Sequence, residues 1–122
     1  MGFVAKRVYD APDPADGRRV LVDRLWPRGI SKEGAELDEW AKDVAPSPGL
    51  RTEWHRAEPE RFDEYAARYR AELDGSEAAT ALLESGRSNE RVTLLFGSRD
   101  VGRNHATVLL EWLATQGADV GG

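Results

Sequence analysis

Apolar residues gather in two short, nearly continuous runs, one early and one late in the chain. The first run falls in residues 18–26 and the second in residues 91–97. Consecutive apolar residues without alternation are typical of a strand that is covered on both faces, as in a parallel sheet. A third segment, residues 3–9, carries the β-favouring residues Val4 and Val8 beside two basic residues and predicts another short strand.

Between and after these strands, apolar residues recur every three or four positions, which is the spacing of one face of an α-helix. The expected helices begin at favourable capping residues and end at glycine or proline. They cover residues 31–44, a short stretch after the N-cap Ser47, residues 59–74, a short stretch after Ser76, and the residues that follow Asn104. Gly117 is expected to end the last helix, and the tail to residue 122 is expected to fray.

This mixture of strands and helices predicts an α/β protein, with a small, mainly parallel sheet and helices packed on it. A chain of 122 residues has the commonest size of one compact domain. We therefore expect a single layered domain over residues 1–122.

Composition excludes several kinds of site. The chain contains no cysteine, which excludes disulfides, thiolate metal sites and cysteine nucleophiles. With only two histidines and no phosphate-binding glycine motif or His-Glu-x-x-His motif, we expect neither a metal nor another cofactor. No apolar run approaches the roughly 20 residues of a membrane span, and the first residues lack the apolar core of a signal peptide. The expectation is a cytoplasmic protein that does not bind membranes.

The net charge of −5 argues against nucleic acid as a partner, because such binding depends on neutralising phosphates. An acidic chain can still carry a local basic pocket. The positions of the arginines are therefore more informative than the total charge.

Two loops that follow the predicted strands carry the residues best suited to chemistry. In an open parallel sheet, ligands bind beyond the carboxyl ends of the strands. The first loop contains Arg24 and Arg28, and the second contains Arg99 and leads to His105 at a helix start. Guanidinium groups suit bidentate recognition of phosphate or carboxylate, and a helix N-terminus adds free backbone N–H groups. If the two strands are neighbours, these loops form a pocket for a small anionic ligand.

Nine residues are candidates for this site. The candidate catalytic residues are His105, which can exchange a proton near neutral pH, and Asp23 and Asp100, which can orient the guanidinium groups. The candidate ligand-binding residues are Arg24, Trp26, Arg28, Arg51, Arg99 and Asn104. The sequence is compatible with binding alone and with an enzyme, and with any oligomeric state.

The same residues fit other functions. Arg24 and Arg99 each adjoin an aspartate and could form structural ion pairs, and Trp26 could serve in packing. A non-catalytic protein-interaction module is the alternative to ligand binding, and it predicts a shallow, exposed surface around Trp26 and Arg28. Nucleic-acid binding is a third hypothesis, which predicts a steep loss of affinity with salt.

Several stretches also match a known sequence pattern. The most specific is Asp-Arg-Leu-Trp-Pro-Arg-Gly at residues 23–29; the others are residues 6–10, 20–22, 37–40, 45–47, 50–51, 62, 69, 93–95, 99–100 and 104–106. Together they resemble the YeaO-like family of bacterial proteins (domain of unknown function 488). The resemblance spans nearly the whole chain and implies an α/β fold, but no particular substrate or reaction. At Gly97-Ser98 the chain departs from the two alanines common in that family, which argues against a role for the Ser98 hydroxyl.

Overall fold

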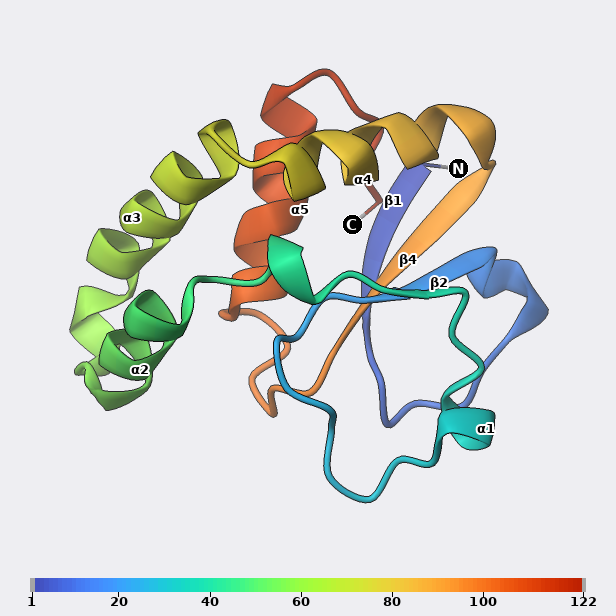
Figure 1. Cartoon of the computed structure of the whole chain (residues 1–122), viewed down its shortest axis with the longest axis horizontal. Helices are drawn as coiled ribbons and strands as arrows, with labels where there is room; N and C mark the ends of the chain where they lie inside the picture. Colours follow the sequence, from blue (N-terminus) through green and yellow to red (C-terminus); the bar gives the residue numbers. More distant parts are fainter. Residues whose placement is uncertain (1, 122) are drawn as a thin grey trace.

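The computed structural model describes residues 2–121 and contains a four-stranded sheet (Figure 1). Its strands are β1 (Gly2–Arg7), β2 (Arg18–Leu21), β3 (Glu39–Trp40) and β4 (Arg91–Phe96), in the order β1-β4-β2-β3. β4 comes late in the chain, yet it lies between β1 and β2 and pairs with both in parallel. The prediction of an α/β fold with a parallel sheet is confirmed.

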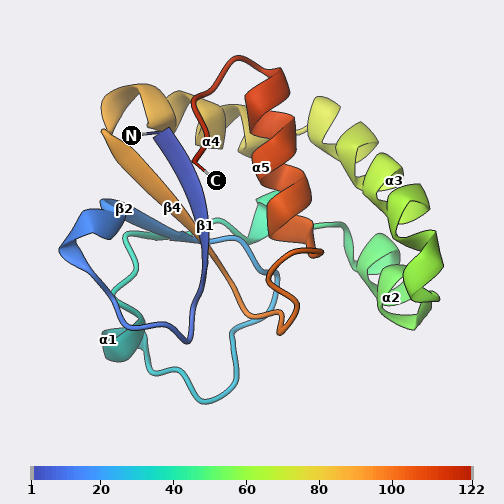
Figure 2. The same ribbon diagram turned by 180° about the vertical axis from the view of Figure 1, so that it is seen from behind.

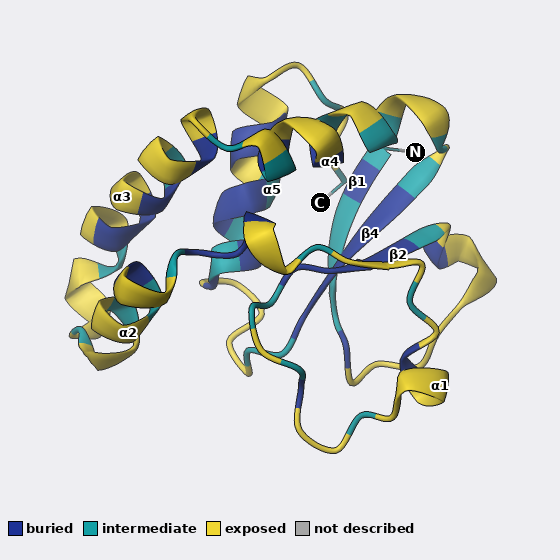
Figure 3. Cartoon of the chain, viewed as in Figure 1, coloured by how far each residue is buried: buried dark blue, intermediate teal, exposed yellow. Residues whose placement is uncertain are grey.

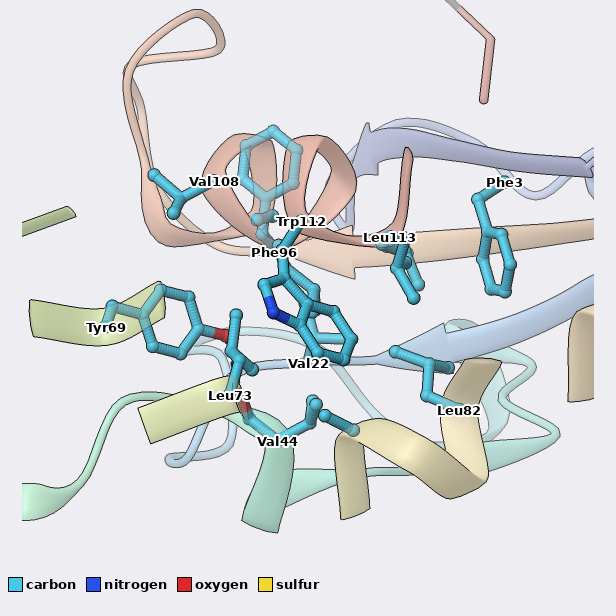
Figure 4. Close-up of a cluster of buried hydrophobic side chains, with 14 of the residues drawn as sticks. Phe3, Val22, Val44, Tyr69, Leu73, Leu82, Phe96, Val108, Trp112 and Leu113 are labelled. Carbon is cyan, nitrogen blue, oxygen red and sulfur yellow. Dashed lines mark hydrogen bonds between the residues drawn. The ribbon is translucent and has the colours of Figure 1, made fainter. Parts of the chain in front are cut away.

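Both faces of the sheet are covered, which explains the continuous apolar runs. Val20, Leu21 and Val22 are consecutive and all fully buried, because successive strand residues point to opposite faces. The larger cluster lies between the sheet and the helices, and Figure 4 shows several of its members. On the opposite face Leu21 and Leu95 pack against residues of the segment that connects β2 to β3.

The helices are longer in the second half of the chain. They are α1 (Lys32–Ala35), α2 (Pro48–Arg56), α3 (Phe62–Asp74), α4 (Glu77–Ser88) and α5 (His105–Thr115), with short 3-10 turns at Pro14–Asp16, Lys42–Val44 and Pro59–Arg61. The inner sides of α3 and α5 are buried and their outer sides are exposed (Figure 3). Within residues 2–121, every helix is too short or too polar for a membrane crossing.

The predicted helix starts are confirmed at three caps. The side chains of Ser47, Ser76 and Asn104 each accept a hydrogen bond from the backbone N–H three residues further on. Such caps satisfy N–H groups that have no partner within the helix. Local sequence therefore determines where α2, α4 and α5 begin.

The predicted helix over residues 31–44 is wrong. α1 is capped by Ser31 as a helix should be, but Glu36 then adopts a left-handed conformation with φ of 46° and ends it. The chain continues as β3 along the edge of β2, where the Ala41 N–H donates to the Leu21 carbonyl at 2.8 Å. A strand satisfies the backbone groups on that edge and a helix does not, so the sheet overrides the helical spacing.

Strands β1 and β2 are shorter than the sequence predicts. β2 ends at Leu21 instead of continuing to residue 26, although the Val22 N–H still donates to the Leu95 carbonyl at 3.0 Å. Beyond Val22 the backbone leaves the sheet, and Leu25 is 57% exposed. β1 similarly ends at Arg7 rather than at residue 9.

The prediction of a frayed tail is wrong for the described residues. Val120 pairs in parallel with Phe3, and the Gly121 N–H donates to the Phe3 carbonyl at 2.7 Å. The tail thus covers the outer edge of β1, whose backbone groups would otherwise lack partners. Residue 122 lies outside the described residues.

A charged cluster is buried on the face of the sheet opposite the longer helices. The Asp16 carboxylate accepts hydrogen bonds from Arg19 and from Lys6, whose Nζ lies 3.0 Å from Oδ1. Arg19 also donates to the Ala35 carbonyl at 2.8 Å and so holds the end of α1 against the sheet. Asp16 and Arg19 are only 7% and 5% exposed, so Arg19 depends on Asp16 for neutralisation, and Asp16 depends on Arg19 and Lys6.

This cluster predicts a loss of stability in acid. Burial by itself would raise the pKa of the Asp16 carboxyl, but hydrogen bonds from Lys6, the Asp13 backbone and Arg19 outweigh it and hold the pKa below the usual 3.8. The unfolded chain therefore binds this proton at a higher pH than the folded chain. Asp16 therefore stabilises the folded protein fully above pH 3.8. This stabilisation is lost as the pH falls toward the lower pKa that Asp16 has in the folded chain.

The measurement is urea unfolding of the wild type and of Asp16→Asn between pH 7 and pH 2. The difference in free energy of unfolding is expected to be constant above about pH 5 and to shrink below about pH 4. A difference independent of pH over this range would contradict the assignment.

Candidate functional site

The candidate site lies at the carboxyl ends of the two neighbouring strands β2 and β4. The loops that follow these strands run beside one another in both views of the molecule (Figures 1 and 2). Together with the α2–α3 region they enclose an open cleft of about 770 Å³. Its walls come from residues 23–28, residues 51–62 and residues 97–105, and all nine predicted site residues line it.

Asp23 ties the segments of this cleft together. Its Oδ2 accepts a hydrogen bond from the Gly97 N–H at 2.9 Å, and its Oδ1 lies 3.2 Å from Nε2 of His105. Its backbone carbonyl accepts from the indole N–H of Trp40 at 2.7 Å. A Cβ on Gly97 would lie 3.0 Å from Asp23 Oδ2, so the absence of a side chain there permits this close approach. Asp23 is thus a positioning residue that joins the ends of β2 and β4 to the start of α5.

His105 is held at the end of β2 through its Nε2 atom. Nε2 lies 3.0 Å from the Val22 carbonyl, which can only accept, so Nε2 carries a hydrogen. The same atom lies 3.2 Å from Oδ1 of Asp23, which is buried and has no hydrogen-bond partner among the described residues.

Arg24 is positioned by carbonyl groups rather than by Asp23. Its Nε donates to the Pro46 carbonyl at 3.2 Å and its guanidinium also reaches the Ala45 carbonyl at 3.4 Å. The carboxylate near it is that of Asp43, at 3.9 Å and largely exposed. The anticipated pairing of Arg24 with its neighbour Asp23 is absent among residues 2–121, since Asp23 is directed to Gly97 and His105.

The other cleft arginines carry no carboxylate partner. Arg28, Arg51, Arg99 and Arg103 line the cleft, and in the described part of the chain no carboxylate oxygen lies within 4.0 Å of their guanidinium nitrogens. The possible Arg99–Asp100 ion pair is therefore not formed. Guanidinium groups without a counter-ion remain available to an external anion.

Asp100 and Asn104 organise the loop before α5. Asp100 Oδ1 accepts from the N–H groups of Gly102 and Arg103, at 3.0 and 2.9 Å, and Asn104 donates to the Asp100 carbonyl at 2.7 Å. Asn104 also caps α5 by accepting from the Thr107 N–H. The N–H groups of Gly102, Arg103 and Thr107 are thus bound by side chains of the same loop and are not available to a ligand.

Trp26 lines the cleft but is itself fixed by packing. Its indole N–H donates to the Ile30 carbonyl at 2.7 Å, and its ring meets that of Trp40 edge-on with centroids 5.3 Å apart. These contacts hold the loop after β2 against the sheet. They occupy the indole N–H, which is therefore not available to a ligand.

The wall formed by the end of α2 and the start of α3 was not foreseen as part of the site. It contributes Trp54, Pro59 and Phe62, and the guanidinium of Arg103 lies over the Phe62 ring, 4.6 Å from its centroid. Trp54 and Phe62 each lie on the inward face of a predicted helix. That position in a helix does not reveal that the two side chains also line a cleft. Arg103 could have been found from its place in the same loop as Arg99.

The cleft differs in charge from the molecule as a whole. Five arginines and three carboxylates line it, whereas the chain carries a net charge of −5. Within residues 2–121, no three His, Asp or Glu side chains come close enough together to hold a metal ion. The site is therefore a basic cleft at the carboxyl edge of a parallel sheet.

Fold and cleft together define an α/β protein with an arginine-lined cleft. The chain belongs to the YeaO-like DUF488 family: the model of the family described as "Inactive DUF488-N3 subclade" matches residues 2–120. It is 52% identical over 107 residues to the uncharacterized protein Rv3073c of Mycobacterium tuberculosis, a match that covers 88% of this chain and 89% of that protein. It is 42% identical over 113 residues to the uncharacterized protein YeaO of Escherichia coli, covering 93% and 97% of the two chains. No solved structure gives a significant match.

Proposed function

We propose that this protein binds a small anionic ligand, of the phosphate or carboxylate type, in the cleft at the carboxyl ends of β2 and β4. The observation that carries the proposal is the gathering of five arginines from three separate segments in one cleft of a net acidic chain. Four of them lack a carboxylate partner within the described residues. Unpaired guanidinium groups in a cleft attract anions, and their planar forks suit two oxygens at a time.

The shape of the site favours a ligand over a protein partner. An interaction module would present a shallow surface around Trp26 and Arg28, whereas these residues border a hollow of about 770 Å³. That volume lies in the range of roughly 300–1,000 Å³ typical of ligand pockets. Trp26 is engaged in packing, which leaves little of it to anchor a partner.

We further propose that the protein binds its ligand without chemical turnover. The family description contains the word "Inactive", which favours binding over catalysis. The contacts of Asp23 and His105 also suit a structural purpose, since both side chains are bonded to backbone groups that hold the loops. The acid–base role predicted for His105 is then a secondary hypothesis, and an activity that is lost in His105→Ala would support it.

Calorimetric titration with inorganic phosphate tests the proposal. The wild type is expected to bind phosphate at low ionic strength, and Arg28→Ala and Arg99→Gln are each expected to weaken binding about tenfold, as the loss of a charge-assisted contact implies. Each variant removes one positive charge from the cleft rim without removing an internal ion pair.

Arg87→Gln is the matched control, because Arg87 lies on α4, outside the cleft, and pairs with the exposed Glu84. This variant changes the net charge of the chain equally and is expected to leave phosphate affinity unchanged. If Arg87→Gln weakens binding as much as Arg99→Gln does, phosphate senses the overall charge and the cleft is not its site.

A further inference from the structure

We infer that the ligand of this cleft is an organic anion that joins a phosphate or carboxylate head to a flat apolar body. This inference rests on the proposed function and specifies the chemical class of the ligand. It comes from the distribution of charged and apolar groups over the walls of the cleft, which differ from one another.

The sheet side of the cleft carries most of the positive charge. Arg24 and Arg28 follow β2, and Arg99 and Arg103 follow β4, so four of the five cleft arginines come from the two strand ends. The hydrogen bond that the Gly97 N–H donates to Asp23 holds these strand ends together. An anionic head is therefore recognised on this side.

The helix side of the cleft is more apolar than the sheet side. Trp54, Ala57, Pro59 and Phe62 line it beside Arg51, His55 and Glu58. The Trp54 and Phe62 rings pack together, with centroids 5.4 Å apart. An inorganic ion has no surface to place against such a wall. A ligand with an apolar body would bury that surface, and apolar burial contributes roughly 25 cal/mol per Å².

Arg103 connects the two sides. It belongs to the loop after β4, but its guanidinium lies over the Phe62 ring on the opposite wall, 4.6 Å from the ring centroid. Guanidinium groups are planar and favour the faces of aromatic rings, so Arg103 can receive a planar group of the ligand on the side that Phe62 does not cover. This contact places a flat, cationic surface at the junction of the charged and apolar walls, which suits a planar body better than a branched aliphatic one.

Two matched pairs of probes test the inference on the wild-type protein. Phenyl phosphate is compared with methyl phosphate, and benzoate with acetate, by calorimetric titration in the same buffer. Within each pair the head is the same and only the body differs. The aromatic member of at least one pair is expected to bind about tenfold or more tightly than its small partner, as burial of a ring predicts. The pair with the larger affinities identifies the head as phosphate or carboxylate.

Phe62→Leu and Arg99→Gln separate the two parts of the ligand. Phe62→Leu keeps an apolar side chain but removes the ring beneath Arg103, so it is expected to lower the ratio of phenyl phosphate affinity to methyl phosphate affinity. Arg99→Gln is expected to weaken both members of the pair equally. The comparison of probes on the wild type remains valid if Phe62→Leu fails to fold.

The outcomes distinguish this inference from the proposed function. If methyl and phenyl phosphate, and likewise acetate and benzoate, bind with equal affinity, anion binding stands and the inference is overturned. If phenol binds as tightly as phenyl phosphate, or if no anion binds, the proposed function itself fails.

Discussion

Asp16→Ala is expected to lower the free energy of unfolding by about 3–5 kcal/mol, the range found when one partner of a buried ion pair is removed. The substitution leaves Arg19, only 5% exposed, without a counter-charge in the interior. It also removes the acceptor of the Lys6 ammonium and of the Asp13 N–H. Because a domain of this kind has only about 5–15 kcal/mol of stability in total, urea unfolding should show a large shift of the midpoint.

Two further variants show whether the effect comes from the unpaired charge. Glu84→Ala removes an exposed carboxylate that pairs with Arg87 and is expected to change stability by less than about 1 kcal/mol. The double variant Asp16→Ala/Arg19→Met is expected to be less destabilised than the two single changes together, since neither charge is then left alone. Additive single effects would show that Asp16 and Arg19 do not depend on one another.

Asp23→Ala is expected to destabilise the protein and to disrupt the cleft at the same time. The Gly97 N–H loses its charged acceptor and His105 loses its neighbouring carboxylate. Loss of a hydrogen bond to a charged group corresponds to about 1.5–3 kcal/mol. With the ends of β2 and β4 no longer tied, phosphate affinity should fall by more than about tenfold, because the guanidinium groups no longer share one geometry.

Asp23→Asn is the matched control for this prediction. Its side-chain oxygen can still accept from the Gly97 N–H, but its amide nitrogen then faces His105 Nε2, so losses of stability and phosphate binding should be smaller than those of Asp23→Ala. The direct readout is the backbone amide of Gly97 by NMR, whose hydrogen exchange should accelerate in Asp23→Ala and remain slow in Asp23→Asn. If Asp23→Ala unfolds at the same urea concentration as the wild type and keeps a slowly exchanging Gly97 amide, Asp23 does not hold the loops together.

Much of the candidate site was accessible from the sequence because arginines follow two nearly continuous apolar runs, each of which predicts a buried strand. The rule that ligands bind at the carboxyl ends of parallel strands then places Arg24 and Arg99 near one edge, and both do line the cleft. The partners of these side chains were not accessible. Asp23 adjoins Arg24 in sequence, yet it bonds to Gly97, 74 residues away, while Arg24 bonds to carbonyls before α2. Adjacency in sequence does not determine which way a side chain points when the backbone leaves a strand.

The same distinction explains the failure at residues 31–44. The spacing of Leu37, Trp40 and Val44 fits a helix face, but the open edge of β2 recruits Glu39 and Trp40 as a strand. Trp40 then contacts Trp26 and the Asp23 carbonyl instead of facing a helix-packed core. Helical spacing shows only which positions are apolar. The unpaired backbone groups on the edge of β2 determine whether those residues form a helix or a strand.

Local sequence determined the parallel α/β class, the buried strands and the starts of α2, α4 and α5, because strand burial and helix capping act over a few neighbouring residues. The tertiary structure alone decided that β4 lies between β1 and β2, that the α2–α3 region forms the apolar wall of the cleft, and that the tail pairs with β1. Those features depend on contacts between segments far apart along the chain, and such contacts are selected by which sheet edges and apolar faces remain to be covered once the local elements have formed.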